Sequence, residues 1–220
     1  MSALIKSSLA RKYAMALSGL FLVVFLLQHF TINLTSVFSE DVFNQLSHFM
    51  GNNPLVQFAL QPVLIFGVVF HLVMGFVLEI QNRKARANKY ANNNGAANSS
   101  WMSRNMIISG LVVLSFLGLH FYDFWIPEMN YKYVEALPEN PTRYFEETVH
   151  KFESPVRVAI YVLSFGFLAL HLLHGFSSSF QSLGANNKYT RALKGFTTAF
   201  AVGIPLGFVF IALLHHLTSF

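Results

Sequence analysis

One stretch near the start of the chain decides which folds are possible: residues 13–34 read YAMALSGLFLVVFLLQHFTINL. It contains no Asp, Glu, Lys or Arg, and a helix needs about 20 mostly apolar residues to cross the hydrocarbon core of a bilayer. Four further stretches have the same character, at residues 56–80, 106–126, 156–176 and 196–217. We therefore predict an all-α integral membrane protein, a five-helix bundle that forms a single domain over residues 1–220.

The composition agrees with this prediction. The chain has 220 residues, of which 54% are hydrophobic and 11% are charged, whereas a soluble domain carries about 25% charged residues. It has no cysteine, which excludes disulfides, thiolate ligands and any iron–sulfur cluster held by this chain. Residues 1–12 are too polar for a signal peptide and the apolar run after them is too long, so we expect the first span to remain in the mature protein.

The charges between the spans predict the orientation of the chain. Nine of the ten acidic residues lie on one side of the predicted spans, and most of the basic residues lie on the other. The positive-inside rule then places the N-terminus in the cytoplasm and the C-terminus outside, as in a multi-pass protein of the inner (cytoplasmic) membrane. The net charge of +5 thus reflects orientation in lipid, and we expect no nucleic-acid partner. The basic side holds Lys6, Arg11, Lys12, Arg83, Lys84, Arg86, Lys89, Arg104, Lys188, Arg191 and Lys194.

Histidines inside the apolar spans are the candidate functional residues. An ionisable group in hydrocarbon is costly and by default indicates function. A transporter or proton pump is expected to bury Asp, Glu, Lys or Arg as well, whereas neutral imidazoles without acid partners suit a metal better. The first four spans carry such histidines: His29, His71, His120, His171 and His174.

Residue counts predict the depth of these histidines. His29 and His120 lie 17 and 16 residues from the basic residues of their loops, or about 24–26 Å at about 1.5 Å per residue. His71 and His174 lie 12 and 14 residues from theirs, or about 18–21 Å. His171 lies 17 residues from the following basic loop, level with the outer pair. His174 is therefore the favoured partner of His71.

Two stacked histidine pairs in a helical bundle predict two haems, each with an imidazole from two facing helices. We expect His29 and His120 to bind the iron of an outer haem, and His71 and His174 to bind that of an inner haem. Arg157, at the outer end of the fourth span, is the expected partner of the outer haem's propionate, although interfacial snorkelling explains it equally well. For any single membrane histidine the alternative is an interhelical hydrogen bond.

Two motifs and the helix plan resemble the cytochrome b subunits of succinate dehydrogenase and fumarate reductase. The first motif is Ser7–His29 (SSLARKYAMALSGLFLVVFLLQH) with Asn33 after it, and the second is Leu170–Gly184 (LHLLHGFSSSFQSLG). Together with five helices in one chain, they resemble the single-chain, di-haem branch of that family. The resemblance covers nearly the whole chain.

The resemblance implies a membrane anchor for a flavoprotein subunit and an iron–sulfur subunit on the cytoplasmic face. Electrons would pass between the iron–sulfur clusters and membrane quinone through two haems b. The family's four ligands correspond to His29, His71, His120 and His174. Some fumarate reductases of this branch have a glutamate two positions before the fourth ligand. Leu172 stands there in this chain, so that proton route is expected to be absent.

Two other functions remain open on the sequence alone. One is the di-haem cytochrome b subunit of another quinone-linked complex, such as a hydrogenase or formate dehydrogenase. The other is a haem-free transporter that carries protons on histidine. The quinone site is also open, because Asn33, Glu79 and Asp123 are all polar residues near predicted helix ends and nothing selects among them.

Overall fold

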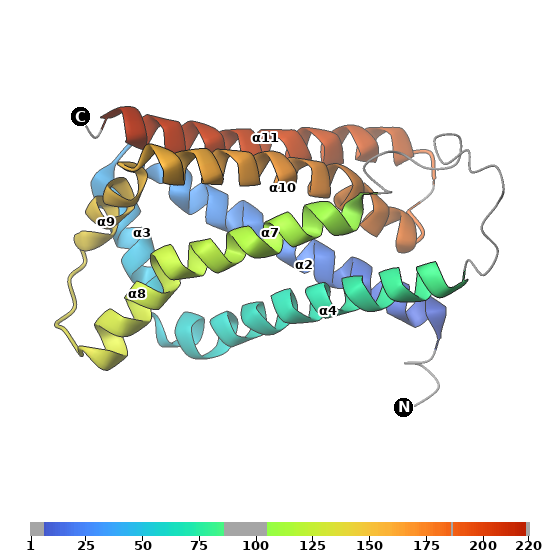
Figure 1. Ribbon diagram of the computed structural model, residues 1–220, viewed down its shortest axis with the longest axis horizontal. Helices are drawn as coiled ribbons and strands as arrows, with labels where there is room; N and C mark the ends of the chain where they lie inside the picture. Colours follow the sequence, from blue (N-terminus) through green and yellow to red (C-terminus); the bar gives the residue numbers. More distant parts are fainter. Residues whose placement is uncertain (1–6, 86–104, 186, 219–220) are drawn as a thin grey trace.

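The computed structural model describes residues 7–85, 105–185 and 187–218. These residues are mostly helical, and no strand occurs among them. Five helical segments are long and apolar enough to cross a membrane, which confirms the predicted multi-pass helical architecture (Figure 1). They are Ser8–Thr35 (α2), Val56–Lys84 (η1, Val56–Leu60, and most of α4, Gln61–Ala85), Met106–Val134 (α7 to η3), Pro155–Ser182 (α10) and Thr190–Thr218 (α11).

The third span extends furthest beyond its predicted end at residue 126. After α7 (Met106–His120) the chain continues through the π-helical turn η2 (Phe121–Trp125), the short α-helix α8 (Ile126–Met129) and the π-helical turn η3 (Asn130–Val134). Pro127 has no N–H to donate to the preceding turn. The π-helical turn η2 lies just before it, and the chain remains helical through the proline. Asp123 therefore lies inside a continuous helix.

Two short amphipathic helices that were not predicted cover one end of the bundle. They are α3 (Glu40–Asn52) and α9 (Arg143–Phe152), which lie together at the left of Figure 1. Ser39 caps α3 by accepting a hydrogen bond from the third backbone N–H beyond it, as helix N-caps commonly do. The rings of Phe43 and Phe145 join the two helices, with centroids 6.3 Å apart. We call this the acidic end, because the acidic loop residues lie here, and the opposite end the basic end.

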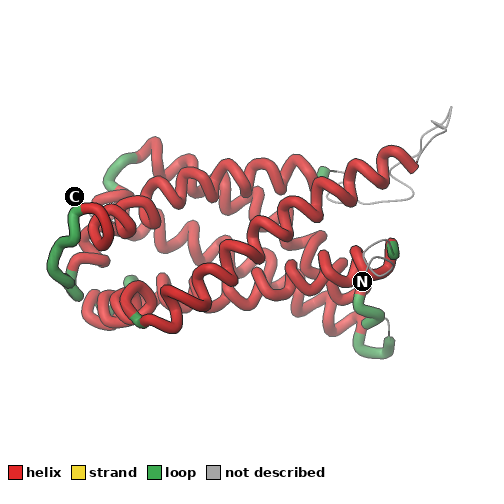
Figure 2. Tube along the Cα trace, turned by 90° about the horizontal axis from the view of Figure 1, so that it is seen from below, coloured by secondary structure: helices red, strands yellow, loops and turns green. Residues whose placement is uncertain are grey.

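The bundle has a small packed core and a wide apolar surface. Helices α10 and α11 pack most closely, and α2 lies against both of them and against α4. Figure 2, turned by 90° from Figure 1, shows the same long helices running along the bundle. Large apolar side chains point outward from the spans, as expected for surfaces that face lipid. The core between the helices contains Phe152, Val158, Tyr161, Phe165, Ile204, Phe208, Ile211 and Ala212.

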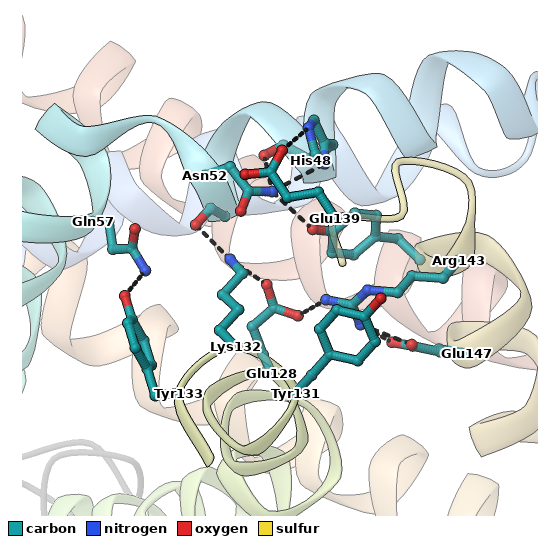
Figure 3. Close-up of polar contacts among 12 residues, drawn as sticks. His48, Asn52, Gln57, Glu128, Tyr131, Lys132, Tyr133, Glu139, Arg143 and Glu147 are labelled. Carbon is teal, nitrogen blue, oxygen red and sulfur yellow. Dashed lines mark hydrogen bonds and ion pairs between the residues drawn. The ribbon is translucent and has the colours of Figure 1, made fainter. Parts of the chain in front are cut away.

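A polar network at the acidic end is organised around Arg143 (Figure 3). Its guanidinium lies between the rings of Tyr131 and Tyr144, 4.0 and 4.5 Å from their centroids. It also donates to Glu147 at 2.7 Å and to Glu128. Burial lowers the pKa of Arg143, but the hydrogen bonds to Glu147 and Glu128 outweigh this effect and raise the pKa above its ordinary value. The network holds the end of the third span against α9.

Candidate functional site

The structure brings the predicted outer pair together. His29 on α2 and His120 on α7 have ring centroids 5.7 Å apart, with the ring planes nearly perpendicular. Each imidazole stacks on a phenylalanine four residues earlier in its own helix. Phe25 lies 5.5 Å from His29, and Phe116 lies 5.7 Å from His120. On α11, Phe208 lies 5.8 Å from His29, so aromatic rings surround this pair.

The second pair is formed by a residue that the depth count did not favour. His71 on α4 and His171 on α10 have ring centroids 6.4 Å apart. His174 lies one turn nearer the basic end and shares a hydrogen bond of 3.3 Å with Ser178 of its own helix. The count was made to Lys188, but α10 already ends at Ser182. The intervening loop residues add little depth, so His171 lies closer to the basic end than the count predicted.

An internal repeat relates the two halves of the bundle. Residues 18–29 (SGLFLVVFLLQH) and 109–120 (SGLVVLSFLGLH) share the pattern S-G-L-x4-F-L-x2-H. Residues 71–76 (HLVMGF) and 171–176 (HLLHGF) share H-L-x2-G-F. The short helices between them share F-x4-H, at residues 43–48 and 145–150. Helices α2, α3 and α4 thus recur as α7, α9 and α10.

The repeat makes the two residues of each pair equivalent. His29 corresponds to His120, and His71 corresponds to His171, whereas His174 corresponds to Met74. Sequence reasoning that counted depth alone missed this relationship, and the repeated motif was the signal that identifies His171. The repeat and the ring contacts therefore indicate the same two pairs, whereas the depth count had favoured His174 in place of His171.

Beside the outer pair lies a buried carboxylate. Asp123 is 1% exposed, accepts a hydrogen bond from the Tyr161 hydroxyl at 2.9 Å and lies 3.2 Å from Arg157 Nε. Its other oxygen has no hydrogen-bond partner among the described residues, and neither has His120 Nδ1. Arg157, predicted to bind a haem propionate, thus already has an ionic partner within the chain. The sequence suggested Asp123 only as one of several quinone-site candidates.

The side chains of the other two polar quinone-site candidates interact with residues of their own helices. Glu79 forms an ion pair with Arg83 at 2.6 Å. The Asn33 amide donates to the backbone carbonyl of His29 at 2.8 Å and lies 3.5 Å from its Nε2, a long distance for a hydrogen bond. Neither contact indicates where a quinone binds.

The spacing of both imidazole pairs is compatible with one metal ion between the two rings. Two imidazole nitrogens that bind one metal at about 2 Å each are about 4 Å apart, and each ring centroid lies about 1 Å further back, which gives about 6 Å between centroids. The observed values are 5.7 and 6.4 Å. No group of three or more His, Cys, Asp or Glu that could hold a metal occurs in the described part of the chain. A porphyrin supplies four nitrogens itself, so two protein ligands suffice.

No family model, curated protein or solved structure matches the chain in the comparisons with known proteins. The histidine pairs and their surroundings are therefore the features from which a function can be inferred.

Proposed function

We propose that the chain is the membrane-anchor, di-haem cytochrome b subunit of a succinate:quinone oxidoreductase. The observation that supports this proposal is the pairing of four imidazoles from four membrane helices, at centroid distances of 5.7 and 6.4 Å. Placing four imidazoles in hydrocarbon costs free energy, and few binding partners other than a metal stabilise them enough to offset it. The two imidazoles of each pair would hold the iron of one porphyrin.

His29 and His120 would bind the outer haem, and His71 with His171 the inner one. The sequence alone favoured His174 at the last position, and it remains the alternative, one turn away on α10. The distance between the rings of His71 and His171 and their equivalence in the repeat support His171.

The protein's contribution would be to position and insulate two redox centres. A bound haem supplies reversible one-electron chemistry. The stacked rings of Phe25 and Phe116 would fix the outer imidazoles and exclude water from them. Two centres at different depths would divide a hydrocarbon core of about 30 Å into shorter steps for electron transfer between an iron–sulfur subunit and quinone.

The basic end would face the cytoplasm, with the N-terminus inside and the C-terminus outside. The positive-inside rule supports this orientation, because the described residues of this end include many cations. An iron–sulfur subunit with its flavoprotein would dock there, and anionic lipid would also be attracted. The cations are Arg11, Lys12, Arg83, Lys84, Lys188, Arg191 and Lys194.

The second candidate is a haem-free proton transporter, and one feature of the structure favours it. Asp123 is a buried acid with one unpartnered oxygen beside His120, and buried acids are characteristic of proton pathways. The contacts of Asp123 with Arg157 and Tyr161 favour a structural role for this carboxylate instead.

The test is to purify the tagged chain from its native membranes, then record its reduced-minus-oxidised spectrum and identify the proteins that copurify. We expect sharp reduced bands of bis-histidine haem b, together with a covalent-flavin subunit and an iron–sulfur subunit. A nickel or molybdenum subunit would instead indicate a hydrogenase or formate dehydrogenase anchor. A colourless chain would support the transporter.

A further inference from the structure

Two serines lie against the inner histidine pair from neighbouring helices. Ser18 Oγ on α2 lies 3.0 Å from His71 Nδ1, and Ser109 Oγ on α7 lies 3.3 Å from His171 Nδ1. Each contact joins helices that are far apart in the sequence. Ser18 and Ser109 also occupy the same position of the internal repeat, so the two contacts are equivalent.

Each serine hydroxyl also bonds to a backbone carbonyl, and this second bond bears on which group is the donor in the serine–histidine contact. Each hydroxyl donates to the backbone carbonyl three residues earlier in its own helix, at 2.9 Å in both cases. A serine hydroxyl has one proton and two acceptor lone pairs. With the hydroxyl proton assigned to the backbone carbonyl, the proton shared with the ring comes from the histidine, and Nδ1 is then the protonated nitrogen of His71 and of His171. Nε2 of each ring then carries the free lone pair.

The glycine after each serine lies beside the same imidazole. A Cβ atom at Gly19 would lie 3.4 Å from His71 Cε1, and one at Gly110 would lie 3.6 Å from His171 Cε1, both ordinary contact distances. One edge of each ring thus lies against a Ser-Gly pair, with the serine hydroxyl as its hydrogen-bond partner.

A third serine–histidine contact differs from these two, because it uses the other ring nitrogen of the histidine. Ser36 Oγ lies 2.8 Å from His215 Nε2 and donates to the carbonyl of Asn33 at 2.6 Å. His215 is 3% exposed and packs between the rings of Phe145 and Phe152. Here the serine occupies Nε2, the nitrogen that is left free in His71 and His171. This contact is therefore interpreted as an interhelical hydrogen bond between the end of α2 and α11.

We infer that Ser18 and Ser109 are positioning residues for the inner haem, which hold His71 and His171 as Nδ1–H tautomers and leave Nε2 of each ring available to bind the iron. The inference rests on the proposed function. Histidines that bind a metal generally donate their other N–H to a fixed acceptor, which orients the ring and raises its basicity. A more basic ligand stabilises ferric over ferrous iron, so loss of the acceptor raises the midpoint potential of that haem.

The test is a redox titration of the purified complex, followed by visible and electron paramagnetic resonance spectra, on Ser18→Ala and Ser109→Ala. Alanine is a good helix former, so both variants should fold. The haem that is missing in His71→Ala identifies the inner signal. Ser36→Ala is the matched control, because it removes a serine–histidine contact outside both pairs. Ser18→Thr is the rescue variant, since a threonine hydroxyl can also bond to the preceding turn.

We expect each alanine variant to weaken the preference of the inner site for ferric iron by about tenfold, which raises its one-electron midpoint potential by about 59 mV. The outer haem and the Ser36→Ala protein should not change, and Ser18→Thr should lie near the wild type. Two haems with unaltered inner potentials in both alanine variants would overturn this inference and leave the proposed function intact. A wild-type chain without haem would overturn both.

Discussion

His171 occupies in α10 the place that His71 occupies in α4: the two residues are equivalent in the internal repeat, and their rings lie 6.4 Å apart. The same holds for His29 and His120 in the other pair, at 5.7 Å. Each pair thus joins the two halves of the bundle, with one imidazole from each half.

This relationship predicts that the loss of His171 and the loss of His174, one turn apart on α10, have different effects on haem binding. His171→Ala should remove the inner haem and leave the outer one, because His71 then has no partner across the bundle. His174→Ala should retain both, since that side chain interacts with Ser178 of its own helix. Haem content per chain, measured on both purified variants, provides the test. If His174→Ala lost a haem and His171→Ala kept two, His174 would be the ligand.

Arg157→Ala should act on both stability and the outer haem. The change leaves Asp123, which is 1% exposed, without its ionic partner. Breaking a fully buried pair costs about 3–5 kcal/mol, and we expect a smaller loss because the Arg157 side chain is 30% exposed. Thermal denaturation in detergent measures the loss, and Asp123→Asn in the same background should restore part of it.

The redox titration of Arg157→Ala addresses the predicted propionate contact separately. Loss of a cation near the outer haem should lower its midpoint potential, because ferric iron is then repelled less. An unchanged potential in a folded variant would restrict Arg157 to its contact with Asp123.

Arg143→Met should destabilise the acidic end without removing haem. The substitution removes the ionic partner of Glu147, one of the two partners of Glu128, and the cation over the rings of Tyr131 and Tyr144. We expect a loss of about 2–4 kcal/mol, since the Arg143 side chain is 9% exposed and Glu147 loses its counter-charge. Thermal unfolding and haem content of the same sample give the two readouts. Loss of both haems at full stability would contradict this division between the network and the haem sites.

The sequence predicted those parts of the fold that depend on composition over long stretches. Five apolar runs gave the five spans, and residue counts within unbroken helices brought His29 and His120 together. The count placed His171 level with the outer pair, whereas its ring lies beside that of His71. The difference arises because α10 ends at Ser182, six residues before Lys188, the charge used as a marker. A residue count measures depth only where the chain is helical.

Other features required tertiary information. The short helices α3 and α9 have too few residues to be identified as spans, and only their packing on each other shows how they cover the acidic end. The burial of Asp123 reflects the approach of Arg157 and Tyr161 from α10. Sequence spacing does not contain this contact between two helices.

The number of haems per chain in the wild type and in His29→Ala and His71→Ala, determined by pyridine haemochrome and protein assay, tests directly whether the histidine pairs hold two haems. We expect two haems b in the wild type and one in each variant, with a different spectral component lost in each. A wild type without haem, or variants that keep both haems, would contradict it.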